Sequence, residues 1–199
     1  MGNHPLQAQL SEYSTRMPRI PQSGPFWCIP ASVENVLKYI GINNLSQEQM
    51  VVRYAKKYGK KSLIIPHGSQ ALTVDPSGLS DQDILRFARH AALSQANFDV
   101  FKSIVEESGV LNSSMWELIF VNGLSDQAAY ADKLKQHIAG QEPVMIASTN
   151  PDGSSHIRVV LAYDSSQLTF YDPAVDEIQS LPYSGFKFND DMLILKRKQ

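Results

Sequence analysis

The sequence predicts a single α+β domain over residues 1–199, with helices in its first two thirds and an antiparallel β-sheet in its last third. The length suits one ordinary domain, and the apolar fraction of 43% allows a sizeable core. Apolar residues recur at helical spacing up to about residue 139, whereas β-branched and aromatic residues form short runs after residue 143. Such halves can pack against each other with a cleft between them.

The first predicted helix begins near the only cysteine. Residues 1–25 are polar and then proline-rich, which indicates an extended arm lying on the domain. Pro30 fits only a first helical turn, and Gly41 suits a helix end. Four apolar residues follow at helical spacing: Val33, Val36, Leu37 and Ile40. Cys28 is therefore expected at the N-terminus of this helix.

The middle region, residues 42–142, is predicted to be helical. Ser46 and Gln49 form a capping box, and Ser80 and Ser125 are further N-caps. The expected helices span residues 46–58, 80–93, 99–108, 113–120 and 126–139.

The C-terminal third is predicted to be a sheet. A turn at residues 164–166 would join two of its strands into an antiparallel hairpin. The expected strands span residues 144–148, 156–163, 168–172 and 192–195.

Charge and composition exclude several classes of partner. The net charge is −2, and the one basic cluster, Lys56, Lys57, Lys60 and Lys61, is read as a solvated helix end, so nucleic acid is not an expected partner. No apolar run is long enough for an integral membrane segment, and the N-terminus lacks the apolar core of a signal peptide. We expect a cytoplasmic location, or export by a route without a Sec signal. The oligomeric state stays open.

Cys28 is a candidate nucleophile as well as a candidate small core residue. The positive end of the helix dipole would favour its thiolate, which is the form that attacks an acyl carbon. Such a thiolate needs a histidine as its base and a third group that orients the histidine. Five histidines are available: His4, His67, His90, His137 and His156. His156 is preferred because it opens a strand directly after a loop, where functional groups often sit.

Asp172 is the candidate residue that orients the His156 ring. This role requires both side chains to lie on the same face of the sheet. With a two-residue turn, Val159 would face Asp172, and His156 would point to the opposite side of the sheet. With an odd-length turn or a β-bulge, Arg158 faces Asp172 instead. His156 and Asp172 then share a face at hydrogen-bonding distance. Taken alone, an Asp-Pro pair commonly ends a strand in a turn, so a purely structural role is the simpler interpretation of Asp172.

Gln22, six residues before Cys28, is a candidate donor to the oxyanion that forms during acyl transfer. The amides at the helix N-terminus would donate beside it. The sequence contains neither a His-Glu-x-x-His zinc motif nor a phosphate-binding Gly-rich loop, so no cofactor or metal is expected.

These residues fall into a familiar pattern. Gln22 precedes Cys28 by six positions, and Pro-Ala-Ser-x-x-Asn-x-Leu-x-Tyr-x-Gly follows from Pro30 to Gly41. The segments 156–164 and 169–173 look like a histidine strand and an Asp-Pro strand. Together these motifs resemble the C39-like family of papain-like cysteine peptidases, over residues 18–41 and 143–196. The middle region shows no such resemblance and is expected to diverge from the family.

The resemblance implies a papain-like fold with its active site in the cleft between the halves. It implies that Cys28 is the nucleophile, His156 the general base and acid, Asp172 the orienter and Gln22 the oxyanion donor. The expected activity is hydrolysis of amide bonds in a peptide or protein substrate through an acyl-enzyme. Ile29 and Ser155 stand where the family often has glycine, which leaves the substrate open.

Two alternatives remain at this stage. The same Cys-His-Asp chemistry serves a transglutaminase-like acyltransferase when an amine replaces water as the acceptor. A catalytically silent papain-like binding module is the third reading.

Overall fold

The computed structural model describes residues 12–122, 127–149, 155–164, 166–182 and 188–198. The first eleven residues of the expected arm, the predicted cap Ser125, the loop before His156 at 150–154 and Ser165 of the predicted turn lie outside these ranges. The prediction that residues 1–25 are extended is wrong in part, because residues 12–16 are helical, and Tyr13 and Met17 are buried in the core.

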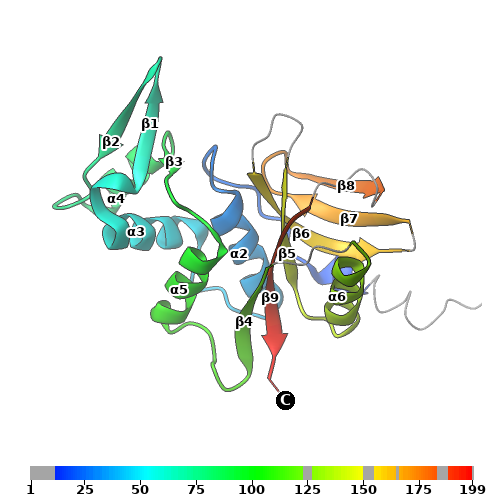
Figure 1. Cartoon of the computed structure of the whole chain (residues 1–199). Coiled ribbons are helices and arrows are strands. Elements are labelled where there is room, and N and C mark those ends of the chain that lie inside the picture. The colour runs from blue at the N-terminus through cyan, green and yellow to red at the C-terminus, as the bar shows by residue number, and fades with distance from the viewer. Residues whose placement is uncertain (1–11, 123–126, 150–154, 165, 183–187, 199) are drawn as a thin grey trace, which may run out of the picture.

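The chain has the predicted α+β architecture, with helices followed by an antiparallel sheet (Figure 1). The helical half contains α2 (Cys28–Tyr39), α3 (Gln47–Tyr58), α4 (Asp81–Ala88), α5 (Phe98–Ser108) and the 3₁₀ turn Gly59–Lys61. Ser46 and Gln49 form the predicted capping box of α3, and the Ser80 side chain caps α4. Among the described residues, no helix is long and apolar enough to cross a membrane.

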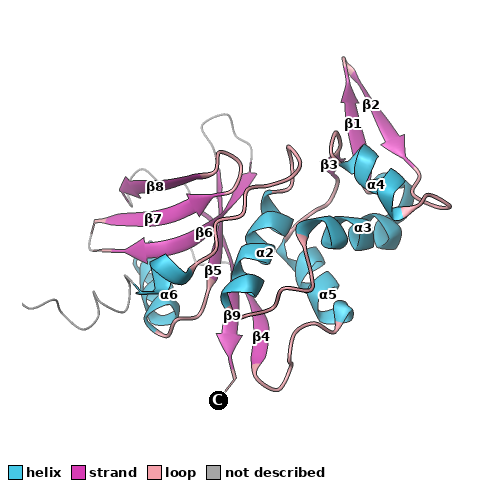
Figure 2. Cartoon of the chain, turned by 180° about the vertical axis from the view of Figure 1, so that it is seen from behind, coloured by secondary structure: helices cyan, strands magenta, loops and turns pink. Residues whose placement is uncertain are grey.

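The larger sheet has six strands in the order β4-β9-β5-β6-β7-β8, and every neighbouring pair is antiparallel. Its strands are β4 (Trp116–Val121), β5 (Val144–Thr149), β6 (Ser155–Tyr163), β7 (Gln167–Asp172), β8 (Glu177–Pro182) and β9 (Phe188–Arg197). Helix α6 (Gln127–Ala139) contacts β5, β6 and β9. Helix α2 packs against β6 and β5 and also contacts α3 and α5, so it joins the two halves (Figure 2).

The prediction that residues 42–142 are helical is wrong in part. This region contains a second sheet of three strands in the order β2-β1-β3, and its hairpin projects from the helical half (Figure 1). The strands are β1 (Leu63–His67), β2 (Gln70–Val74) and β3 (Ala92–Leu93). The predicted helix 80–93 ends earlier, at Ala88, because Ala92 and Leu93 pair with β1.

The predicted helix 113–120 is also wrong, since this segment forms β4. Trp116 and Leu118, two positions apart, are both buried, and β4 pairs along its whole length with β9. A partner almost eighty residues away in sequence overrides the local preference. Strand β8, which was not predicted, is an exposed edge strand with little apolar alternation.

The pairing of β6 with β7 contains the β-bulge that is needed to put His156 and Asp172 on one face of the sheet. Near the turn, Tyr163 pairs with Leu168, as a two-residue turn requires. A β-bulge then lies between Val160 and Ala162, and beyond it Val159 pairs with Tyr171. The extra residue shifts the register by one, so His156 and Asp172 lie on the same face of the sheet.

Candidate active site

Cys28 is the first residue of α2, directly after a turn that is fixed by packing. Trp27 is fully buried, and its indole Nε1 donates to the carbonyl of Ala88 at 3.1 Å. Gly24 lies against the Trp27 ring, where a Cβ would stand only 2.7 Å from ring atoms. These contacts hold the N-terminus of α2 in place, and with it the Cys28 thiol and the helix amides that have no partner within the helix.

The end of the same helix forms as its sequence predicts. Gly41 has a φ of 87°, and its amide donates to the Lys38 carbonyl. The Ile42 amide donates to the Leu37 carbonyl, which completes a Schellman motif.

His156, near the start of β6, joins Cys28 and Asp172. Its Nε2 lies 2.6 Å from Oδ1 of Asp172, and the Cys28 side chain on its other side helps to raise the pKa of the ring. Both side chains are largely buried, with exposed fractions of 11% for His156 and 5% for Asp172. The three residues thus lie together from helix α2 to strand β7, with His156 hydrogen-bonded to Asp172.

Asp172 has donors on both of its carboxylate oxygens. The Ala174 amide donates to Oδ1 at 2.9 Å, beside His156. Arg158 Nε donates to Oδ2 at 3.0 Å. The predicted Asp-Pro turn therefore also contributes to the site, because it places the Ala174 amide under the carboxylate.

The electrostatics of this row favour a charged pair at neutral pH. Burial lowers the pKa of His156, but hydrogen bonds to Asp172 and Cys28 outweigh it and raise that pKa to about 9. Burial raises the pKa of Asp172, yet the His156 ring, the Ala174 amide and Arg158 hold it below its usual value. His156 is therefore an imidazolium and Asp172 a carboxylate at pH 7.

Gln22 is held beside Cys28 from both sides. Its backbone amide donates to the carbonyl of Pro173 at 2.9 Å, so the arm is tied to the residue after Asp172. The Gln47 side chain of α3 brackets Gln22: it accepts from the Ser23 amide at 2.8 Å and donates to the Pro21 carbonyl at 3.0 Å. The Gln22 oxygen Oε1 is buried and has no hydrogen-bond partner among the described residues.

Asn35, on the buried side of α2, fastens the arm further upstream. Its Oδ1 accepts from the Ile20 amide at 2.8 Å, and its Nδ2 donates to the carbonyls of Ile20 and Ala31. The side chains of Asn35 and Gln47 thus act as two clamps on the segment that leads to Gln22.

All four predicted site residues, Cys28, His156, Asp172 and Gln22, line one cleft of about 650 Å³ between the helical half and the sheet. Most of its other walls are apolar, including Phe26, Ile29, Leu93, Phe98, Ile157 and Val175. Phe26 and Val175 are about half exposed.

None of the other described histidines lines this cleft. His67 and His90 are exposed, and His137 is buried with its Nδ1 at 2.6 Å from Glu142. His4 lies outside the described residues.

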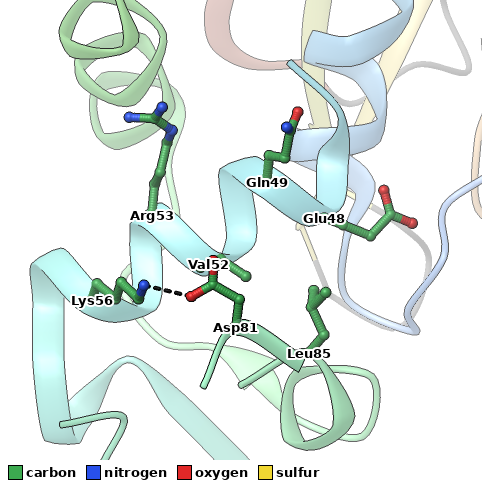
Figure 3. Close-up of a pocket in the computed structure, with 7 residues that line it drawn as sticks. All are labelled: Glu48, Gln49, Val52, Arg53, Lys56, Asp81 and Leu85. Carbon is green, nitrogen blue, oxygen red and sulfur yellow. Dashed lines mark ion pairs between the residues drawn. The ribbon is translucent and has the colours of Figure 1, made fainter. Parts of the chain in front are cut away.

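A second hollow, of about 440 Å³, lies between α3 and α4 (Figure 3). There Lys56 of α3 reaches Asp81 of α4 in an ion pair, and neither a thiol nor an imidazole lines the hollow. Within the described ranges, no group of three or more His, Cys, Asp or Glu side chains is placed to hold a metal ion.

The sequence matches the Peptidase_C39 like family over residues 3–189, and the chain belongs to this family. The matched range includes the middle region, which showed no resemblance by its motifs. No curated protein matches the sequence significantly.

Sequence reasoning missed two residues that shape the site, Arg158 and Gln47. The strand register that places His156 beside Asp172 also places Arg158 opposite Asp172, so Arg158 could have been found from the sequence. Gln47 carried no such signal, because a glutamine in the first turn of a helix is ordinary.

Proposed function

We propose that this member of a peptidase family is an active cysteine hydrolase that cleaves amide bonds in peptides or proteins. The observation that carries the proposal is the His156–Asp172 hydrogen bond in the same cleft as Cys28, which begins helix α2. In this proposal Cys28 is the nucleophile, His156 the general base and acid, and Asp172 the orienter of the ring.

The reaction begins with the Cys28 thiolate beside the His156 imidazolium. The thiolate attacks the substrate carbonyl carbon, and the developing oxyanion accepts hydrogen bonds from Nε2 of Gln22 and from the Cys28 amide. His156 gives its Nδ1 proton to the leaving amine, and a thioester with Cys28 remains. His156 then takes a proton from water, and the resulting hydroxide releases the acid and regenerates the thiolate.

The clamps on the arm support the assignment of Gln22. An oxyanion donor contributes to catalysis only when it is in place before the charge develops. The two hydrogen bonds from Gln47 and the bond to Pro173 restrict the backbone on both sides of Gln22.

Alkylation of Cys28 by iodoacetamide between pH 4 and pH 9 tests the activated thiol without a known substrate. We expect the wild type to react well below pH 7, and His156→Ala to react only near the free-thiol pKa of about 8.5. Equal behaviour of the two proteins would contradict the proposal and favour a binding module.

A peptide mixture incubated with the wild type and with Cys28→Ala then tests turnover. Peptide-bond cleavage by the wild type alone supports hydrolysis. Added amine that appears in the products at the expense of free acid would instead indicate the acyltransferase.

A further inference from the structure

Arg158 lies on the same face of β6 as His156 and opposite Asp172. Its side chain is 12% exposed, and its Nε donates to Oδ2 of Asp172 at 3.0 Å. His156 and the Ala174 amide engage the other oxygen, Oδ1. Arg158 is thus the donor that the described residues provide for Oδ2.

Arg158 is itself held in place by two neighbouring strands. Its Nη1 donates to the hydroxyl of Ser148 on β5, and Ser148 is buried. The guanidinium carbon lies 5.2 Å from the centre of the Phe170 ring on β7. A planar guanidinium suits this combination, because it can stack on an aromatic ring while it donates in its own plane.

We propose that Arg158 is a positioning residue for the triad: by binding Oδ2 of Asp172, it directs Oδ1 of the carboxylate at Nε2 of His156. This inference rests on the proposed function. Without Arg158, Oδ2 would be an unpaired oxygen on a buried carboxylate. The carboxylate would then turn towards another donor or take up a proton, and either change deprives His156 of its ionised partner.

The test measures the rate of Cys28 alkylation by iodoacetamide at pH 5, together with the thermal unfolding midpoint. We expect Arg158→Gln to slow alkylation about tenfold or more, since hydrogen bonds to charged groups contribute that much. The control is Arg197→Gln. Arg197 also lies on a strand of the larger sheet and stacks on an aromatic ring, Trp116, but its side chain has no contact with the triad. Its substitution should leave the rate unchanged.

A double-mutant cycle separates positioning from general support of the fold. If Arg158 acts through Asp172, adding Arg158→Gln to Asp172→Asn should change the alkylation rate by less than about twofold. A tenfold loss in both backgrounds, or no loss in the wild-type background, would overturn the inference. A wild type without an activated thiol would instead defeat the proposed function, so the two failures are distinguishable.

Ser148→Ala provides a second test of the role of Arg158 if the Arg158→Gln variant does not fold. It removes the hydroxyl that accepts from Nη1 of Arg158 and that also donates, over a long 3.5 Å, to the backbone carbonyl of His156, and it leaves the Arg158 charge in place. We expect a loss in the same direction but smaller, about two- to fivefold, as for one hydrogen bond removed. No change in the rate would contradict the role assigned to Arg158.

Discussion

The Gln22 amide donates to the carbonyl of Pro173 over 2.9 Å, and this bond ties the arm before Cys28 to the end of strand β7. Asp172 directly precedes Pro173. The proposed oxyanion donor and the proposed orienter of His156 are therefore connected through one backbone hydrogen bond. Movement of the arm away from the sheet would disturb both functions together.

Replacement of Gln22 by alanine should lower kcat about 10²- to 10³-fold on a cleaved peptide, because one oxyanion donor is lost. KM should change little, since the donor acts mainly on the transition state. The rate of Cys28 alkylation should stay at the wild-type value, because iodoacetamide forms no carbonyl oxyanion. Alkylation slowed as strongly as in His156→Ala would assign Gln22 to the thiolate pair instead.

Gln47→Ala should reduce kcat about five- to tenfold, since it removes two hydrogen bonds that bracket Gln22. The loss should disappear when Gln22 is already alanine. Gln49→Ala is the matched control, because Gln49 lies in the same helical turn but caps its own helix. Equal kcat losses in the Gln47 and Gln49 variants would show that helix stability, and not the clamp, is responsible.

Gly24→Ala should destabilise the domain by about 1–3 kcal/mol, because the new Cβ meets the buried Trp27 ring at 2.7 Å. Urea unfolding measures this change. The control is Gly140→Ala, where the nearest atom would lie 3.4 Å away in ordinary contact. A Gly24 variant as stable as the wild type would mean that Trp27 can shift without loss.

The stability contributed by His156 should depend on pH in a defined direction. Its pKa is raised from the ordinary 6.5 to about 9, so the folded state binds the proton more tightly than the unfolded state. This contribution is complete below about pH 6.5 and is lost as the pH rises to about 9, with an upper limit of about 3 kcal/mol. The difference in unfolding free energy between wild type and His156→Gln should shrink over that range.

His90→Gln is the control for this pH series, since His90 is exposed. This substitution at an exposed site should change the free energy of unfolding by no more than about 0.5 kcal/mol. A constant difference between wild type and His156→Gln from pH 6 to pH 9.5 would contradict the raised pKa.

Much of the fold could be predicted because its signals are local. The capping box at Ser46 and Gln49 and the stop at Gly41 mark helix ends within a few residues. Strand β4 could not be found in this way, because Trp116–Val121 is fixed by pairing with β9 at the far end of the chain. The hairpin of β1 and β2 was missed for another reason: Pro66 and Gly68 look like loop residues, and most of β2 is exposed.

The contact between His156 and Asp172 could be predicted only as a condition on strand register. Because side chains alternate along a strand, His156 and Asp172 share a face only if the turn has an odd number of residues or a strand contains a β-bulge. The sequence does not say which of the two is present. The structure places the bulge between Val160 and Ala162. Leu161, the extra residue, is fully buried, so packing of the core fixes a feature that the turn residues do not encode.

The bulge also limits how the chain can change in evolution. Side chains along β6 and β7 can be exchanged while the site keeps its geometry, provided that their packing is preserved. Loss of the extra residue Leu161, or gain of a second one beside it, is tolerated less easily, because every side chain before the bulge would turn to the opposite face. The spacing within this part of the hairpin is thus under a tighter constraint than its composition, because a change of one residue there would turn His156 away from Asp172.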